Sequence, residues 1–206
     1  MKRKTNLKVL FLLLVPFFPT AAFAGSENAI LGFQISDCYT YDKVAANAAP
    51  GWAARSRDSQ LQLEYIFGFI SGVNEYSNKK TLRAFTESDV IEWFDEHCAT
   101  YRAETMLMAL EAHIEANGPE DLIVRSGGNC ESYIKAGDVR LHEIGRPRFN
   151  YMTGFLSGVT SYYTTDILRN AGTAQIIEWF DVYCGQHPNT PIIEALRDYV
   201  TDSVGR

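Results

Sequence analysis

The sequence predicts an all-α protein made of two tandem small four-helix domains, each stapled by one disulfide. Three observations support this fold class. Two helix-like stretches recur 86 residues later in the chain, apolar residues follow the helical period, and strand signals are nearly absent. The only short strand candidate is the segment 121–125.

An internal repeat divides the folded chain into two copies. Two six-residue stretches are shared: GFISGV at 68–73 with GFLSGV at 154–159, and VIEWFD at 90–95 with IIEWFD at 176–181. A period this long indicates two copies of a small fold rather than the unit of a solenoid. We expect copy one at residues 25–117, a short linker at 118–128 and copy two at 129–206.

Residues 1–24 have the layout of a cleaved secretory signal peptide. Basic residues come first, an apolar run of about ten residues follows, and Ala22-Phe23-Ala24 forms a small-x-small cleavage site before Gly25. The apolar run is too short to span a bilayer comfortably. We therefore expect a periplasmic or secreted protein with no stable membrane insertion after cleavage.

The charge of the mature chain limits its partners. The signal peptide holds four of the 19 Lys and Arg residues, so 15 basic residues face 25 acidic ones and the net charge is −10. Nucleic acids and anionic membrane surfaces attract basic patches instead. We expect protein partners, either several clients or one envelope protein, and no nucleic acid.

The four cysteines all follow the signal peptide. In an oxidising compartment an even number predicts disulfides, and four cysteines permit three pairings. Each copy has one cysteine near its start and one at the end of its Trp-Phe helix, so the repeat favours Cys38–Cys98 and Cys130–Cys184. Each bond closes a loop of roughly 55–60 residues, which contributes about 4 kcal/mol in the chain-entropy model.

The first two helices of each copy follow from capping residues and apolar spacing. Asp37 in copy one and Asn129 in copy two are suited to cap a short helix that carries the first cysteine. A longer second helix is expected at about 59–77 and again at about 148–163. Its apolar residues in copy one are Tyr65, Phe69, Val73 and Tyr76.

Two glycines share the apolar face of each second helix: Gly68 and Gly72 in copy one, Gly154 and Gly158 in copy two. A glycine inside a helix costs about 1 kcal/mol relative to alanine. Their repetition favours a helix packed closely against another backbone over a ligand-binding role. No strand signal precedes them, so a phosphate-binding loop is not supported.

The third helix is expected at about 87–98 and about 173–184, capped in copy one by Thr86 or Ser88. Its core face in copy one holds Ile91, Phe94 and Cys98. The fourth helix is expected from about Ala103 and, in copy two, from Thr190-Pro191, a capping residue followed by proline. Its expected buried residues are Leu107, Leu110 and Ile114, matched by Ile193, Leu196 and Val200.

No set of residues predicts catalysis, a metal or a cofactor. The carboxylate pairs Glu92/Asp95 and Glu178/Asp181 could suggest glycoside cleavage, but they lie opposite an apolar helix face, which favours a solvated surface. The four histidines occupy non-equivalent positions in the two copies. A Cys–His dyad would need a free thiol, and zinc would need clustered Cys and His ligands. We expect a non-enzymatic protein without cofactor or metal.

The two copies resemble the HdeA/HdeB family. The resemblance rests on a cysteine near the start, a central Gly-Phe-x-Ser-Gly helix, and the sequence YCGQHP at 183–188 leading into IIEAL at 192–196. Copy two matches over about 129–204. Copy one keeps both cysteines and the glycine helix, but residues 98–102 lack the Cys-x-x-x-Pro turn.

Members of this family are small, exported, all-helical proteins with one disulfide, best known as periplasmic acid-stress chaperones. The resemblance implies a tandem of two HdeA-like domains that exposes apolar surface at low pH and holds unfolded clients. Charge supplies a physical cause, because neutral carboxylates with 15 basic residues and 4 histidines move the net charge from −10 to about +19 near pH 2. The alternative is an envelope immunity or inhibitor protein with one specific partner, since the same elements are similar to exported immunity proteins of the Tai type.

Overall fold

The computed structural model describes residues 37–45, 55–76, 83–117, 120–122, 128–135, 146–162 and 172–204. The signal peptide expected at 1–24 and most of the linker expected at 118–128 lie outside these ranges. The described part confirms the all-α class, with one pair of three-residue strands added. Its elements are α1 (Cys38–Ala45), α2 (Arg57–Tyr76), β1 (Arg83–Phe85), α3 (Glu87–Thr100), α4 (Met106–Asn117), β2 (Glu120–Leu122), α5 (Cys130–Lys135), α6 (Arg146–Tyr162), α7 (Thr173–Gln186) and α8 (Ile192–Val204).

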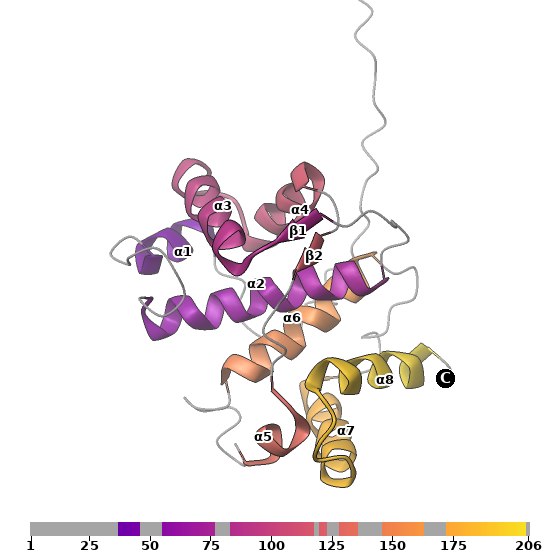
Figure 1. Cartoon of the computed structure of the whole chain (residues 1–206). Coiled ribbons are helices and arrows are strands. Elements are labelled where there is room, and N and C mark those ends of the chain that lie inside the picture. The colour runs from indigo at the N-terminus through magenta and orange to yellow at the C-terminus, as the bar shows by residue number, and fades with distance from the viewer. Residues whose placement is uncertain are drawn as a thin grey trace, which may run out of the picture.

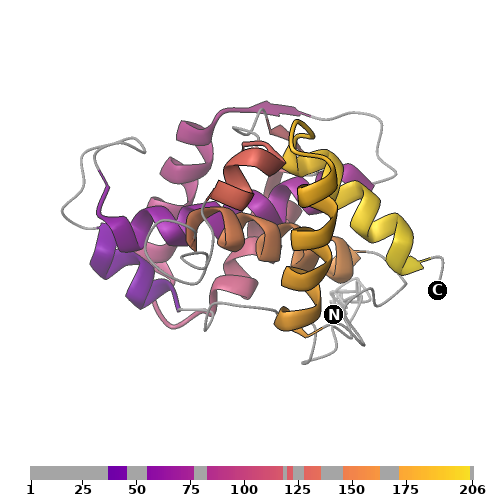
Figure 2. The same ribbon diagram turned by 90° about the horizontal axis from the view of Figure 1, so that it is seen from below.

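The second helices of the two copies, α2 and α6, lie against each other at the centre of the molecule and form its most extensive helix–helix contact. Helices α1, α3 and α4 lie on one side of this pair, and α5, α7 and α8 lie on the other (Figure 1). The view from below shows the C-terminal helices α7 and α8 beside each other (Figure 2). The buried apolar residues of both copies form one continuous core cluster.

Both expected disulfides are confirmed. Cys38–Cys98 joins α1 to α3, and Cys130–Cys184 joins α5 to α7, so each bond lies within one copy. The first helices begin with the expected caps. The Asp37 carboxylate accepts a hydrogen bond from a backbone N–H at 2.8 Å, and the Asn129 side chain accepts one at 3.0 Å.

The start of each first helix is also bonded to the turn before the fourth helix. The backbone N–H of Cys38 donates to the carbonyl of Glu104 at 2.8 Å, and that of Cys130 donates to Thr190 at 2.8 Å. The same backbone contact therefore recurs at corresponding positions of the two copies.

These bonds explain where the fourth helices begin. Our expectation of a start near Ala103 is wrong, because residues 101–105 form the turn whose carbonyls bond α1, and α4 begins at Met106. The buried stripe shifts with the start. Met106 and Ile192 are buried, whereas Leu107 and Ile193 are only partly buried.

The third helices differ in how they begin. Thr86 caps α3 in a reciprocal capping box: its side chain accepts from the backbone N–H of Asp89, and the Asp89 carboxylate accepts from the backbone N–H of Thr86. In copy two, Gly172 takes the cap position and supplies no side-chain hydrogen bond. The two strands, β1 and β2, pair in parallel, and β2 overlaps the strand candidate at 121–125.

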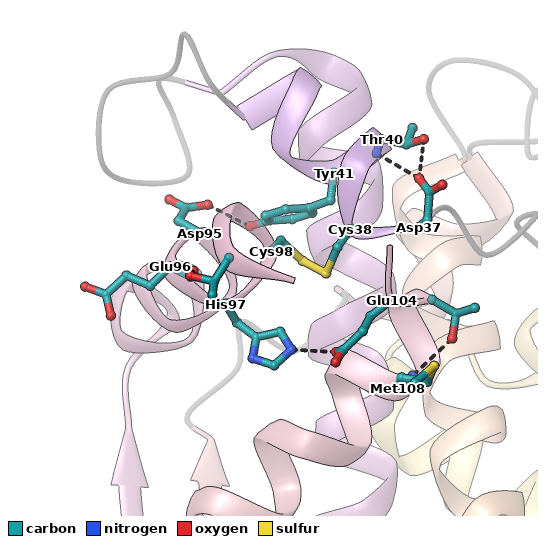
Figure 3. Close-up of a disulfide and its surroundings, with 12 residues drawn as sticks. Asp37, Cys38, Thr40, Tyr41, Asp95, Glu96, His97, Cys98, Glu104 and Met108 are labelled. Carbon is teal, nitrogen blue, oxygen red and sulfur yellow. Dashed lines mark hydrogen bonds and ion pairs between the residues drawn. A yellow bond between two sulfur atoms is a disulfide. The ribbon is translucent and has the colours of Figure 1, made fainter. Parts of the chain in front are cut away.

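One carboxylate of each third helix has a partner that the sequence did not lead us to expect. The hydroxyl of the buried Tyr41 donates to Asp95 at 3.0 Å, and that of Tyr133 donates to Asp181 at 3.1 Å (Figure 3 shows the first). Burial, reinforced by the Asp95 charge, raises the pKa of Tyr41, which stays protonated. Describing Asp95 and Asp181 only as solvated surface was therefore incomplete.

In copy one a cation joins this pair. The Arg55 side chain is 1% exposed and forms an ion pair with Asp95. Burial opposes its charge, but the hydrogen bond and charge of Asp95 leave the pKa of Arg55 raised.

The buried ion pair predicts unequal costs for two substitutions on α3. Asp95→Asn removes the charge that faces the buried Arg55 and is expected to lower the free energy of unfolding by about 2 kcal/mol or more. Glu96→Gln is the matched control, because this neighbouring side chain is exposed, and it is expected to change the stability by about 0.5 kcal/mol or less. Urea unfolding of the mature chain at pH 7 measures both. Equal losses would contradict the role assigned to Arg55.

Candidate functional site

The crossing of α2 and α6 brings two helix backbones into direct contact. A Cβ atom added at Gly68 would lie 2.1 Å from the carbonyl oxygen of Tyr151, and one at Gly72 would lie 2.1 Å from that of Phe155. Real Cβ atoms do not approach a backbone oxygen this closely, so only glycine fits. The Cα–H that replaces the Cβ points toward the carbonyl, a geometry known from closely packed helix pairs.

The contact is reciprocal. A Cβ at Gly154 would lie 2.2 Å from the carbonyl oxygen of Tyr65, and one at Gly158 would lie 2.1 Å from that of Phe69. All four glycines singled out in the sequence thus lie in one interface, and the backbone that each pair contacts is the second helix of the other copy. The repeated motif packs against itself.

Two hydrogen bonds flank the glycines across the crossing. The hydroxyl of Tyr65 bonds the Ser157 side chain, and that of Tyr151 bonds the Ser71 side chain. Each serine hydroxyl donates to the carbonyl four residues earlier in its own helix, at 2.7 Å for Ser71 and 2.8 Å for Ser157.

Burial raises the pKa of both Tyr65 and Tyr151 to about 12. At neutral pH these hydroxyls are therefore protonated and are not candidates for general base chemistry. Their bonds to the serines join the two helices beside the glycines.

Polar contacts also close the ends of the crossing. The buried Asn150 side chain on α6 donates to the Leu61 carbonyl on α2 at 3.0 Å. At the other end, Arg197 on α8 forms two hydrogen bonds of 2.7 Å with the Glu75 carboxylate on α2. The bond to Glu75 raises the pKa of Arg197, so a fixed positive charge joins copy two to copy one.

Two of the described histidines contact the same Trp93 ring on the outer side of copy one. His97 lies 2.8 Å from Glu104 and stacks on Trp93, whereas the buried His113 packs against Trp93 in a T-shaped arrangement (Figure 3 shows His97 and Glu104). Within the described ranges no group of three or more His, Cys, Asp or Glu residues could hold a metal ion. The crossing itself is a non-covalent association of two apolar helix faces.

Sequence reasoning identified the glycines but missed the tyrosine–serine bonds. The signal was present, because both copies carry the full motif Tyr-x-x-Gly-Phe-x-Ser-Gly at 65–72 and 151–158. Of the repeated Trp-Phe pairs on the third helices, Phe94 and Phe180 are fully buried, while Trp93 and Trp179 are only partly buried against the core. None of the described helices is long and apolar enough to cross a membrane.

The crossing can be tested with two glycine substitutions. Gly68→Ala forces a methyl group against the Tyr151 carbonyl and is expected to lower the free energy of unfolding by about 3 kcal/mol or more. Gly185→Ala is the matched control, because a Cβ at this helical position meets nothing within 4 Å. The control should be neutral or stabilising by up to about 1 kcal/mol. Chemical unfolding at pH 7 compares them, and similar stabilities of the two variants would show that the helices do not approach this closely.

Comparison of the chain with protein-family models, with curated proteins and with solved structures finds no match.

Proposed function

We propose that this chain is an exported, non-enzymatic protein that binds unfolded clients in acid, in the manner of an HdeA-like tandem. In this proposal the two copies hold each other's apolar helix faces at neutral pH. At low pH the crossing of α2 and α6 opens and the freed faces bind clients. The two disulfides fit an oxidising compartment outside the cytoplasm, and a periplasmic location is part of the proposal.

The main support for this proposal is that no disulfide of the described residues joins the two copies. Each disulfide ties a first helix to a third helix inside one copy, whereas the α2–α6 crossing is held by packing and hydrogen bonds. Loss of the crossing would leave both copies stapled. It would expose buried residues of the two second helices, including Phe69, Val73, Phe155 and Val159.

Acid acts on this arrangement through charge. Protonation of the carboxylates takes the mature chain from −10 to about +19 near pH 2, and like charges on the two copies then repel. This repulsion opposes the Glu75–Arg197 bridge, which joins the two copies at one end of the crossing. It therefore favours separation over the closed state.

The Asp37 carboxylate that caps α1 also loses stabilising interactions as the pH falls. Hydrogen bonds from Thr40 lower the pKa of the Asp37 carboxyl below its ordinary value. A lowered pKa contributes stability at pH values above the ordinary one, and this contribution is lost as the pH falls through the folded-state pKa. Asp37 therefore adds to destabilisation in the same acidic range as the wider charge reversal.

The proposal predicts acid-specific protection of a client that also responds to the crossing. Mature chain and an acid-denatured test protein are mixed at pH 2.5 and at pH 7, with light scattering for aggregation and an apolar-surface dye in parallel. Protection and dye binding are expected only in acid. Gly68→Ala should move their onset to higher pH because it weakens the crossing, while Gly185→Ala should leave the onset unchanged.

Two results would contradict the proposal. One is a lack of protection at pH 2.5 in a chain whose fold and dye binding match those at pH 7. The other is protection in acid with the same onset for Gly68→Ala and Gly185→Ala, which would separate client binding from the crossing.

A further inference from the structure

The third and fourth helices present different surfaces in the two copies. In copy two, α8 covers an aromatic stack on α7 with carboxylates. The ring centroids of Trp179 and Tyr183 lie 4.7 Å apart, the Trp179 indole donates to Asp202 at 3.3 Å, and the Tyr183 hydroxyl donates to Asp198. The hydrogen bond to Asp198, followed by burial, raises the pKa of Tyr183 to about 12.

Copy one has the same stack without carboxylates from the fourth helix, and Glu104 of the preceding turn lies 2.8 Å from its His97. Trp93 stacks on His97 at 4.4 Å, and His97 lies 4.7 Å from Tyr101. At the α4 positions that correspond to Asp198 and Asp202, the chain has alanine, at 112 and 116. The position that corresponds to Glu194 holds methionine, at 108.

The result is a surface on copy one that is partly apolar and open. The Tyr101 side chain is 52% exposed and Met108 is 51% exposed, on either side of the turn between α3 and α4. We name this surface the copy-one aromatic face. It comprises Trp93, His97, Tyr101, Met108, Ala112 and Ala116.

Negative charge surrounds this face. Between Thr86 and Asn117 the chain has eight acidic residues and one basic residue, Arg102, which is paired with Asp42 of α1. Four residues of the face each follow a glutamate in the sequence. These glutamates are Glu92, Glu96, Glu111 and Glu115. Burial raises the pKa of Glu111, and the other three are exposed.

We propose that the copy-one aromatic face binds a cationic, apolar-anchored segment of a partner protein. Exposed aromatic and methionine side chains supply the anchor, because such residues dominate the centres of protein interfaces. The carboxylates supply the complement to Lys and Arg, and the exposed Tyr101 supplies a ring face for a cation. This site belongs to the folded chain at neutral pH, so it does not depend on acid opening of the crossing.

The test uses the mature chain at pH 7 and a dye-labelled, 16-residue helical peptide of leucine and lysine, with a leucine–glutamate peptide of the same pattern as its counterpart. Fluorescence anisotropy measures the Kd. The lysine peptide is expected to bind with one-to-one stoichiometry and more weakly as salt rises. The glutamate peptide is expected not to bind.

Variants locate the site. The double substitution Tyr101→Ser with Met108→Ser removes the exposed anchor and is expected to raise the Kd at least tenfold without changing the net charge. Val182→Ser is the matched control, since this side chain is 57% exposed on α7 of copy two. It should leave the Kd unchanged. Circular dichroism melts confirm that the exposed substitutions leave the fold intact.

Several outcomes would overturn the proposal. Failure of the lysine peptide to bind, equal Kd values for the double variant and the unmodified chain, or an equal loss with Val182→Ser would each do so. A concentration-dependent dimer that only the double variant abolishes, without peptide binding, would assign the face to a second copy of this chain instead. None of these outcomes depends on client protection in acid, so this site and the proposed function fail independently.

Discussion

The backbone contact between α2 and α6 is the constraint on which the rest of the structure depends. Four glycines are placed where any side chain would strike a carbonyl oxygen of the opposite helix. With the helices this close, the phenylalanines beside the glycines are fully buried, and each tyrosine reaches a serine across the interface. The remaining helices are then arranged on the two sides of a centre that neither copy builds alone.

Covalent and non-covalent forces are divided between different parts of this arrangement. The disulfides tie the short first helices, α5 with six residues and α1 with eight, to the third helix of the same copy. The crossing has no such staple and relies on packing. A chain built in this way can lose contact between its copies while each copy keeps a closed loop of more than fifty residues.

The two copies share a framework and differ in electrostatics. In copy one a buried arginine joins the tyrosine–aspartate pair and the aromatic stack is left without carboxylates from the fourth helix. In copy two, two aspartates of the fourth helix bond the stack. The shared features concern folding, so the differences are where distinct interactions of the two copies are to be sought.

The repeat allowed much of this fold to be predicted from one sequence. The disulfide pairing, the helix caps at Asp37 and Asn129 and the close-packing glycines all follow from features present twice. Which helix packs against the glycines could not be predicted, because the spacing of residues within one helix does not identify its neighbour in the fold. The late start of α4 was missed because tertiary bonds to α1 hold residues 101–105 as a turn, against their local helix propensity.

The tyrosine–aspartate pairs were missed for a different reason. The cysteines that close the two loops are 60 residues apart in copy one and 54 in copy two, so Tyr41 and Tyr133 fall outside the constant 86-residue offset of the later helices. Alignment from the cysteines instead would have placed both tyrosines three residues after their half-cystine.

The most direct test of the central claim is a distance measurement between the copies. Spin labels are introduced as non-canonical residues at the exposed positions Glu96 and Val182, with a second pair at Tyr39 and Glu96 inside copy one, and pulsed electron resonance is recorded at pH 7 and pH 2.5. Our account predicts narrow distributions for both pairs at pH 7, and at pH 2.5 a longer, broader distribution for the first pair alone. A 96–182 distance that is already broad at pH 7, or that is unchanged at pH 2.5, would contradict it.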